Sequence, residues 1–111
     1  MEKLILTGLA ASAGIAEGVV KVVDRRSHTS VDFEEGGILV TEMTEPAMVM
    51  LMNKAAGIVT DVGGITSHAA IVSRELGIPC ITAAKTATKD LKDGMRVRLN
   101  GSNGEVTLLD I

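Results

Sequence analysis

The chain has 111 residues, a net charge of −3 and 46% hydrophobic residues, a composition that predicts one folded domain, residues 1–111. It holds one Phe and no Trp or Tyr, so it lacks the aromatic platforms on which single-stranded nucleic acids stack. It also has no basic run, and therefore no electrostatic footprint for a nucleic acid or an anionic membrane.

The cysteine content and the N-terminal sequence predict a cytoplasmic protein. Cys80 is the only cysteine, so the chain forms no internal disulfide, and its Ile-Pro-Cys-Ile context predicts a buried thiol in a strand. Residues 1–12 lack the charge pattern and the apolar length of a signal peptide. No stretch reaches the length of a transmembrane helix.

Short apolar runs predict strands in the first part of the chain. The predicted strands are residues 4–9, 19–23 and 38–41. Small residues around Gly14 end the first strand, and Gly36-Gly37 open the third. Residues 24–35 are polar and mixed in charge, which predicts a solvated loop.

A helix is predicted to begin at Glu45-Pro46, because proline is tolerated in the first helical turn and an acid favours the N-terminal dipole. Gly57 is predicted to end it. Apolar residues recur at helical spacing along one face, which predicts packing in the core. They are Met48, Leu51, Met52 and Ala55.

A second helix is predicted over residues 68–76. Ser67 or Thr66 serves as its N-cap, and Gly77 with Pro79 ends it. Short strands are predicted on either side of this helix, at residues 58–60 and 80–82.

The C-terminal part predicts a turn or short helix over residues 88–92, followed by a β-hairpin. The hairpin strands are residues 95–99 and 105–109, joined by Asn100-Gly101-Ser102-Asn103-Gly104. Strands at both ends with two or three helices between them predict an α/β domain with a mixed sheet.

His68 is a candidate nucleophile, because it stands where a glycine loop turns into a helix. Unpaired N–H groups and the positive end of the helix dipole suit such a position to a phosphate. The same dipole disfavours a protonated imidazole, which keeps a ring nitrogen available for attack. Thr66 and Ser67 hydroxyls are placed to hold phosphate oxygens. The chemistry predicted here is nucleophilic catalysis through a phosphohistidine.

Other interpretations of His68 remain open at this stage. It can be an exposed polar residue at a helix end. A zinc site with His28 or Cys80 lacks ligand spacing. A Ser-His-Asp hydrolase using Ser67, Ser73 or Asp61 lacks a nucleophile elbow.

The roles of two charged residues near His68 also remain open. Asp61 is either a neighbour that orients the phosphate site or a polar cap at a strand end. Arg74 lies almost two turns after His68, so a surface pairing with Glu75 or another acid is favoured over phosphate contact.

The stretch from Gly63 to Arg74, GGITSHAAIVSR, resembles at every position the phosphorylation-site signature of the phosphoenolpyruvate-utilising enzymes. That family includes phosphoenolpyruvate synthase, pyruvate phosphate dikinase and enzyme I of the bacterial sugar phosphotransferase system. Residues 8–23, 36–62 and 87–109 are similar to the same domain of those enzymes. The resemblance implies their mobile, swivelling phosphohistidine domain, a β/β/α fold.

By position, the resemblance makes His68 the phosphoryl acceptor through Nε2, with Gly63, Gly64, Thr66 and Ser67 shaping the loop around the phosphate. Thr66 matches a threonine that a regulator protein phosphorylates in dikinases. A phosphate there would add negative charge where the transferred group must dock. Asp61 and Arg74 are supporting candidates.

The chain departs from the family pattern in two ways. Where relatives tend to have a glycine-containing stretch, this chain has Ala83-Ala84-Lys85-Thr86. The resemblance implies that glycines are replaced at Ala83 and Lys85, in a loop expected to meet a partner. It also has no room for the nucleotide-binding domain or the phosphoenolpyruvate-binding barrel.

The leading hypothesis is a stand-alone phosphoryl carrier. Its donor would be a separate nucleotide-binding or phosphoenolpyruvate/pyruvate-binding protein, with Mg²⁺ and ATP or phosphoenolpyruvate on that partner and no cofactor on this chain. No metal, nucleic acid or membrane partner is expected. The alternatives are a regulatory module whose phosphohistidine is sensed by a partner, and a binding scaffold in which His68 is idle.

Overall fold

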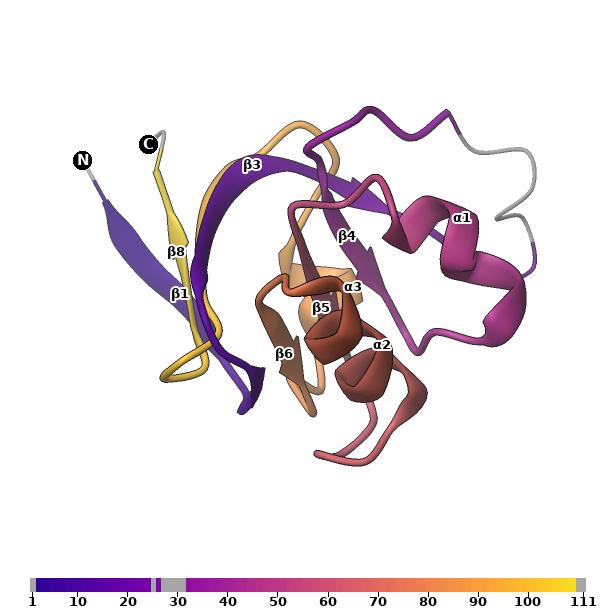
Figure 1. The fold of residues 1–111 in the computed structure, drawn as a ribbon. Coiled ribbons are helices and arrows are strands. Elements are labelled where there is room, and N and C mark those ends of the chain that lie inside the picture. Colours follow the sequence, from indigo (N-terminus) through magenta and orange to yellow (C-terminus); the bar gives the residue numbers. More distant parts are fainter. Residues whose placement is uncertain (1, 25, 27–31, 110–111) are drawn as a thin grey trace.

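Eight strands in the described part of the chain form one mixed sheet (Figure 1). The computed structural model describes residues 2–24, 26 and 32–109. The strands are β1 (Lys3–Thr7), β2 (Leu9–Ser12), β3 (Ile15–Val22), β4 (Ile38–Thr41), β5 (Gly57–Thr60), β6 (Cys80–Thr82), β7 (Arg96–Asn100) and β8 (Glu105–Leu108). Their order is β1-β8-β7-β3-β4-β5-β6-β2. The pairs β3–β4, β4–β5 and β5–β6 are parallel and the others antiparallel, which confirms the predicted mixed sheet.

β3 joins the antiparallel half of the sheet to the parallel half. Its residues 15–19 pair with β7, and its residues 20–22 pair with β4. Figure 1 shows this long strand curving over the molecule, so that β1 and β8 lie across from the parallel strands. The two halves enclose one hydrophobic core, to which all eight strands except β2 contribute.

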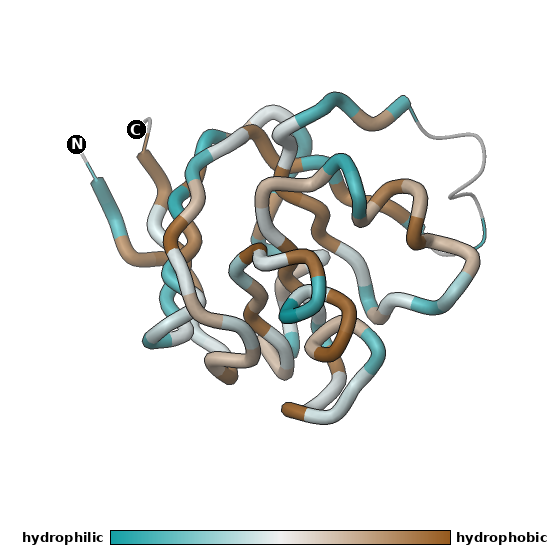
Figure 2. Tube along the Cα trace, viewed as in Figure 1, coloured by the Kyte–Doolittle hydropathy of each residue, from teal (hydrophilic) through white to brown (hydrophobic). Residues whose placement is uncertain are grey.

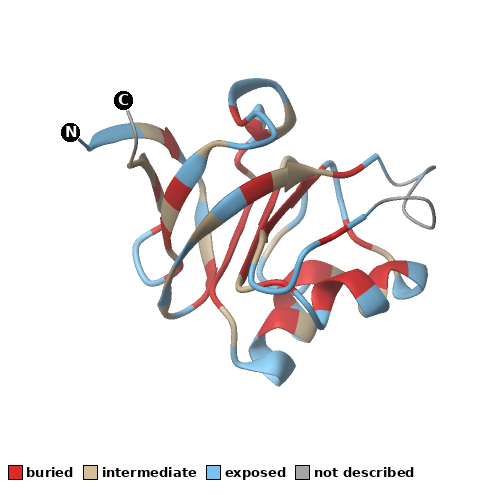
Figure 3. Cartoon of the chain, turned by 90° about the horizontal axis from the view of Figure 1, so that it is seen from above, coloured by how far each residue is buried: buried red, intermediate tan, exposed pale blue. Residues whose placement is uncertain are grey.

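The parallel strands are buried on both faces, as expected for strands between two layers. One face of β4, β5 and β6 packs against the antiparallel half and carries Val40, Val59 and Ile81. The other packs against helices and carries Leu39, Ile58 and Cys80. Figure 2 shows hydrophobic residues running through these central strands, and Figure 3 shows the buried sides of the helices facing them. The layers are therefore β/β/α.

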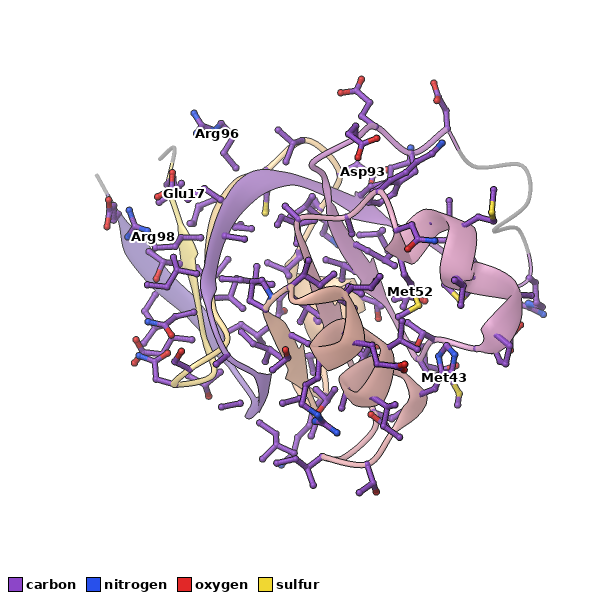
Figure 4. All side chains as sticks on the ribbon, viewed as in Figure 1. Glu17, Met43, Met52, Asp93, Arg96 and Arg98 are labelled. Carbon is purple, nitrogen blue, oxygen red and sulfur yellow. The ribbon has the colours of Figure 1, made fainter. Side chains whose placement is uncertain are left out.

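The predicted helix after Glu45 is shorter than expected. A 3-10 turn at Pro46–Met48 leads into α1 (Val49–Met52), and the chain then leaves the helix. The Lys54 carbonyl accepts from Gly36 N (2.8 Å), and Ala56 N donates to the Gly37 carbonyl (2.9 Å). These bonds draw the chain into β5, so Gly57 begins a strand and does not end a helix. The predicted methionine face is confirmed as core, and Met52 lies between α1 and the sheet (Figure 4).

The single strand predicted over residues 4–9 is wrong, because the chain turns at Gly8. The residues before Gly8 form β1 at one edge of the sheet, and those after it form β2 at the other edge. Gly8 N donates to the carbonyl of Gly104 (2.8 Å), which holds the corner against the β7–β8 turn. Hydropathy alone does not show this change of partner.

The solvated loop predicted over residues 24–35 is wrong at its end. Phe33, the lone aromatic residue, is 4% exposed and packs in the same core as Val23 and Leu39. His28 lies outside the described residues. Among the described residues, no helix has the length and apolar character needed to span a membrane.

The C-terminal prediction is confirmed with small shifts in its boundaries. Residues 101–104 connect β7 and β8 as an antiparallel hairpin. The predicted turn or helix is α3 (Ala87–Asp90), whose Ala87 packs in the core between the two halves of the sheet. The second predicted helix is α2 (His68–Leu76), which ends at Gly77 in the left-handed conformation with φ 73°.

Candidate functional site

The N-terminus of α2 is built by local sequence, and it places His68 as the first helical residue. Ser67 has an extended backbone and its Oγ accepts from Ala70 N (3.4 Å), which confirms Ser67 as the N-cap. The same hydroxyl donates to the Gly64 carbonyl (2.8 Å). Ser67 therefore links the glycine loop to the first turn of the helix.

The His68 ring is held by a residue from a neighbouring strand end. Its Nδ1 lies 2.8 Å from Oγ1 of Thr44, which follows β4 and is 4% exposed. No described residue hydrogen-bonds Nε2. The contact orients the imidazole through Nδ1, and it leaves Nε2 as the ring nitrogen available for reaction.

The amides around His68 can receive an anion. Among the described residues, none accepts a hydrogen bond from the backbone N–H of His68 or Ala69, the first two residues of α2. The same holds for the N–H groups of Ile65 and Thr66 in the preceding loop. Unpaired amides at a helix N-terminus are typical phosphate ligands.

The two loop glycines differ in what surrounds them. Gly63 has φ +120°, and a Cβ there would meet Ser67 Cβ and Oγ at 3.1 Å. Gly64 has an ordinary φ, and a Cβ added there would have no atom within 4 Å. The fold therefore explains Gly63, whereas Gly64 leaves open space beside the loop. Thr66 is exposed next to this space.

Arg74 pairs with neither Glu75 nor another described acid, so the predicted surface pairing is wrong. Its Nη1 donates to the Ala11 carbonyl in β2 (2.8 Å), and its Nη2 donates to the Ile65 carbonyl in the glycine loop (2.8 Å). The guanidinium lies between the edge strand and the loop. Arg74 is therefore engaged with the backbone of the site.

Asp61 serves α3 in the described structure. One carboxylate oxygen accepts from Thr88 N (3.0 Å), and the other accepts from the Thr88 hydroxyl (2.5 Å). Because Thr88 is in the first turn of α3, this contact acts as a helix cap supplied from the end of β5. The structure places both carboxylate oxygens on Thr88, and neither hydrogen-bonds a described residue of the glycine loop.

Cys80 is buried in β6, as predicted, and burial raises the pKa of its thiol to about 11. A thiol that stays protonated is a poor nucleophile and a poor metal ligand. Among the described residues, no three His, Cys, Asp or Glu side chains cluster as a metal site, and His28 lies outside them. These observations give the zinc interpretation no support.

The hydrolase interpretation requires hydrogen bonds from His68 to a serine and to an aspartate, and the described residues do not form them. The described partner of the His68 ring is Thr44, and Ser67 Oγ is used as the helix cap. Ser73 is fully buried on α2, and Asp61 is held by Thr88. No described Ser-His-Asp relay reaches His68.

Thr44 is the site residue that sequence reasoning missed. It lies 24 residues before His68, directly before the predicted start of a helix at Glu45, and the sequence predicted no role for it. No local signal pointed to it, because the contact depends on β4 and β5 pairing as parallel neighbours, so that the chain segments after them meet at one edge of the sheet.

Comparison with known proteins gives the family. A family model described as PEP-utilising enzyme, mobile domain, matches residues 33–104. A probable phosphoenolpyruvate synthase of Archaeoglobus fulgidus is 58% identical over 104 residues, which cover 94% of this chain. The chain spans only 14% of the length of that relative.

Solved structures share the fold. The solution structure of an Enzyme I protein, nEIt, is 33% identical in sequence and has a TM-score of 0.62. The match covers 72% of this chain and 33% of the Enzyme I chain. The holo-form of aconitase X from Thermococcus kodakaraensis covers 99% of both chains with a TM-score of 0.69. At 24% identity this second likeness shows the fold alone, so the histidine motif and not the fold carries the functional argument.

The family match includes β4, the segment carrying Thr44, the glycine loop and all of α2. The fold has the layers that the resemblance implied, and His68 lies at the N-terminus of α2 with its ring held through Nδ1. The chain belongs to the family of PEP-utilising enzyme mobile domains.

Proposed function

We propose that this chain is a phosphoryl carrier that accepts the group on Nε2 of His68 and passes it to an acceptor. The hydrogen bond between His68 Nδ1 and Thr44 Oγ1 (2.8 Å) is the observation that carries the proposal. A nitrogen that attacks phosphorus needs its lone pair. When Nδ1 keeps the ring proton and donates it to Thr44, the lone pair is on Nε2.

In the first step the Nε2 lone pair attacks the phosphorus of the donor. The Nε2–P bond forms while the bond from phosphorus to the donor's bridging oxygen breaks, and that oxygen keeps the electron pair. The positive charge gained by the ring is shared with Nδ1–H, which the Thr44 oxygen stabilises. In the second step an acceptor oxygen attacks phosphorus, and Nε2 leaves with its electron pair.

The donor must supply most of the positive charge for this transfer. Within the described site, Arg74 is the one cationic side chain that hydrogen-bonds the glycine loop, and both of its Nη atoms are occupied by carbonyls. Backbone amides can hold phosphate oxygens, but transfer from ATP or phosphoenolpyruvate also requires neutralisation of the donor. We expect Mg²⁺ and basic residues on the donor protein to provide it.

The surface around His68 supports transfer between proteins or domains. Four exposed apolar side chains lie on the segments that meet at the site, and such surface is typical of docking. They are Met43, Val62, Ile65 and Ile71. The donor and acceptor would be nucleotide-binding or phosphoenolpyruvate/pyruvate-binding domains, on a separate protein or on a longer chain, in the cytoplasm.

The first test is intact-mass analysis at alkaline pH after incubation with native lysate, Mg²⁺ and either ATP or phosphoenolpyruvate. We expect one added phosphoryl group, lost on brief acid treatment and absent from His68→Ala. His28→Ala is the matched control, because His28 is the other histidine of the chain, and it should be labelled fully. Absence of the adduct, or its persistence in His68→Ala, would refute the proposal.

Onward transfer separates a carrier from a sensed module. Purified phosphorylated chain is mixed with the donor fraction and pyruvate, and the remaining phosphohistidine is followed by mass. A carrier loses its phosphoryl group at a rate that depends on the acceptor. A chain that keeps the group under all acceptor conditions fits the regulatory alternative.

Thr44→Val tests the role of the Nδ1 contact. Valine keeps the shape and removes the hydroxyl, so the ring loses the group that orients it and stabilises its charge. Because a hydrogen bond to a charged group contributes about 1.5–3 kcal/mol, we expect phosphorylation to slow about 10-fold to 100-fold. Thr44→Ser should retain most of the rate. Equal rates in the valine variant and the parent chain would show that the contact is not used.

A further inference from the structure

Arg74 connects three parts of the structure through one side chain. It belongs to α2, its Nη1 donates to the Ala11 carbonyl in the edge strand β2, and its Nη2 donates to the Ile65 carbonyl in the glycine loop. Both distances are 2.8 Å. Ala11 is 4% exposed, so one end of this bridge is fixed in the sheet.

The glycine loop has few other ties. Among the described residues, the remaining hydrogen bonds of residues 63–67 stay within the loop and the first turn of α2. The Ile65 side chain is 56% exposed and adds little packing. The Arg74 contact is therefore the described hydrogen bond that ties the middle of the loop to the sheet.

Anchoring the Ile65 carbonyl also sets the direction of a neighbouring donor. The Ile65 C=O and the Thr66 N–H belong to one planar trans peptide, in which the two groups point in opposite directions. With the oxygen held by Arg74, the Thr66 N–H is directed away from the guanidinium. No described residue accepts a hydrogen bond from this N–H, so it is free to bind a phosphate oxygen.

We propose that Arg74 is a positioning residue, which holds the loop so that its amides, the Thr66 N–H first among them, bind the phosphoryl group carried by His68. The inference rests on the proposed carrier function and assigns no phosphate contact to Arg74 itself. A planar guanidinium places two donors at once on two carbonyls. A lysine ammonium is a single point charge and reaches both carbonyls less well.

The kinetic test compares Arg74→Ala, Arg74→Lys and Arg98→Ala in the same donor assay. Arg98 is a matched control, since it also links two distant parts of the chain, through hydrogen bonds to Glu2 and Glu17. It lies on the opposite side of the molecule from Met43 (Figure 4). We expect Arg74→Ala to lower the maximal phosphorylation rate about 10-fold with little change in the half-saturating donor concentration. Arg74→Lys should recover only part of the rate, and Arg98→Ala should keep all of it.

Chemical rescue and the backbone motion of the loop distinguish positioning from general stability. Guanidinium ion at a non-denaturing concentration should restore part of the Arg74→Ala rate, whereas ammonium should not. The NMR order parameter of the Thr66 amide should fall in Arg74→Ala at unchanged thermal stability, because the loop gains fast backbone motion when its anchor is lost. A parental rate in Arg74→Ala, or a loss that guanidinium leaves unchanged and that follows the loss of stability, would overturn the inference.

Failure of the carrier function gives a different pattern. If the parent chain takes no phosphoryl group from any donor, the proposed function fails. The Thr66 order parameter then still decides whether Arg74 holds the loop. An unchanged Thr66 amide in Arg74→Ala would overturn the positioning role on its own.

Discussion

At the scale of single residues, the two glycines before His68 experience different constraints. Gly63 has a φ of +120°, which residues with a side chain rarely adopt. A Cβ added at Gly63 would also lie 3.1 Å from the Cβ and Oγ atoms of Ser67. Gly64 faces open space with an ordinary backbone. A folding requirement therefore explains Gly63, and a functional one is needed for Gly64.

This contrast predicts opposite phenotypes for two alanine variants. Gly63→Ala should lower the free energy of unfolding by about 1–2 kcal/mol, because it combines left-handed strain with close contacts. Gly64→Ala should leave stability within about 0.5 kcal/mol and slow phosphorylation of His68, since the new methyl group occupies space offered to the phosphate. Urea denaturation and the mass assay measure the two effects. A Gly64→Ala protein with the parental rate would show that no phosphate oxygen approaches there.

At the scale of elements, the connection from β6 to α3 contains left-handed backbone without glycine. Ala83 has φ 53° and Lys85 has φ 69°, the two positions at which the family resemblance led us to expect glycines. Ala84 N donates to the Thr60 carbonyl (3.0 Å), and Lys85 N donates to the Asp61 carbonyl (2.9 Å). These bonds to the end of β5 hold the strained conformation in place.

Glycine at these two positions should stabilise the chain. Ala83→Gly and Lys85→Gly remove the steric cost of the left-handed conformation in the folded state, but they also increase the conformational entropy of the unfolded state. Because the first effect is larger, each substitution should raise the free energy of unfolding by about 0.5–1 kcal/mol. Ala84→Gly is the control, because Ala84 is buried and has a negative φ, and it should destabilise. The urea concentrations at the midpoint of unfolding rank the stabilities of these variants. Stabilisation by Ala84→Gly, or destabilisation by both others, would contradict the strain argument.

The buried thiol in β6 makes stability depend on alkaline pH. Burial raises the pKa of Cys80 from 9.0 to about 11, so the folded state binds the proton more tightly than the unfolded state. The corresponding stability is fully present below pH 9 and is lost as pH rises towards 11, by about 2–3 kcal/mol. Urea unfolding of the parent and Cys80→Ala between pH 8 and pH 11 should show this extra loss only in the parent. If the free energies of unfolding of the parent and Cys80→Ala fell equally with pH, the buried thiol would not be the cause.

At the scale of the whole molecule, two groups of exposed apolar side chains allow a comparison between surface near the site and surface away from it. One group is near His68 and comprises Met43, Val62, Ile65 and Ile71, each 37–56% exposed. The other lies on β3 and comprises Ile15 and Val19, which are 63% and 47% exposed. Only the first group adjoins the site at which a donor and an acceptor must exclude water.

Polar substitutions in the two groups should therefore separate docking from folding. Val62→Ser and Ile71→Ser should raise the half-saturating concentration of the phosphoryl donor severalfold while the melting temperature changes by only a few degrees. Val19→Ser should change neither rate nor donor affinity. The donor titration of the mass assay measures this. Equal effects of Val19→Ser and Val62→Ser would show that the face around His68 is not a docking surface.

Much of the architecture follows from local patterns in the sequence. The apolar runs of the central strands, the Ser67 cap and the Gly77 stop are recognisable because they depend on residues a few positions apart. The predictions that were wrong depend on distant pairing. β1 and β2 are separated by Gly8 because they find partners at opposite edges, and α1 is short because Gly36 and Gly37 bond the chain that follows it.

The sequence by itself determined the position of His68 at a capped helix N-terminus, since glycine loops and caps are local features. Only the tertiary structure decided what surrounds it. Thr44 reaches His68 across 24 residues, Arg74 reaches Ala11 across 63, and Asp61 is drawn to Thr88 across 27. The parallel pairs β4–β5 and β5–β6 bring the first and third contacts together, and the antiparallel pairing of β2 with β6 brings Ala11 near Arg74. Residue spacing along the chain carries no record of that proximity.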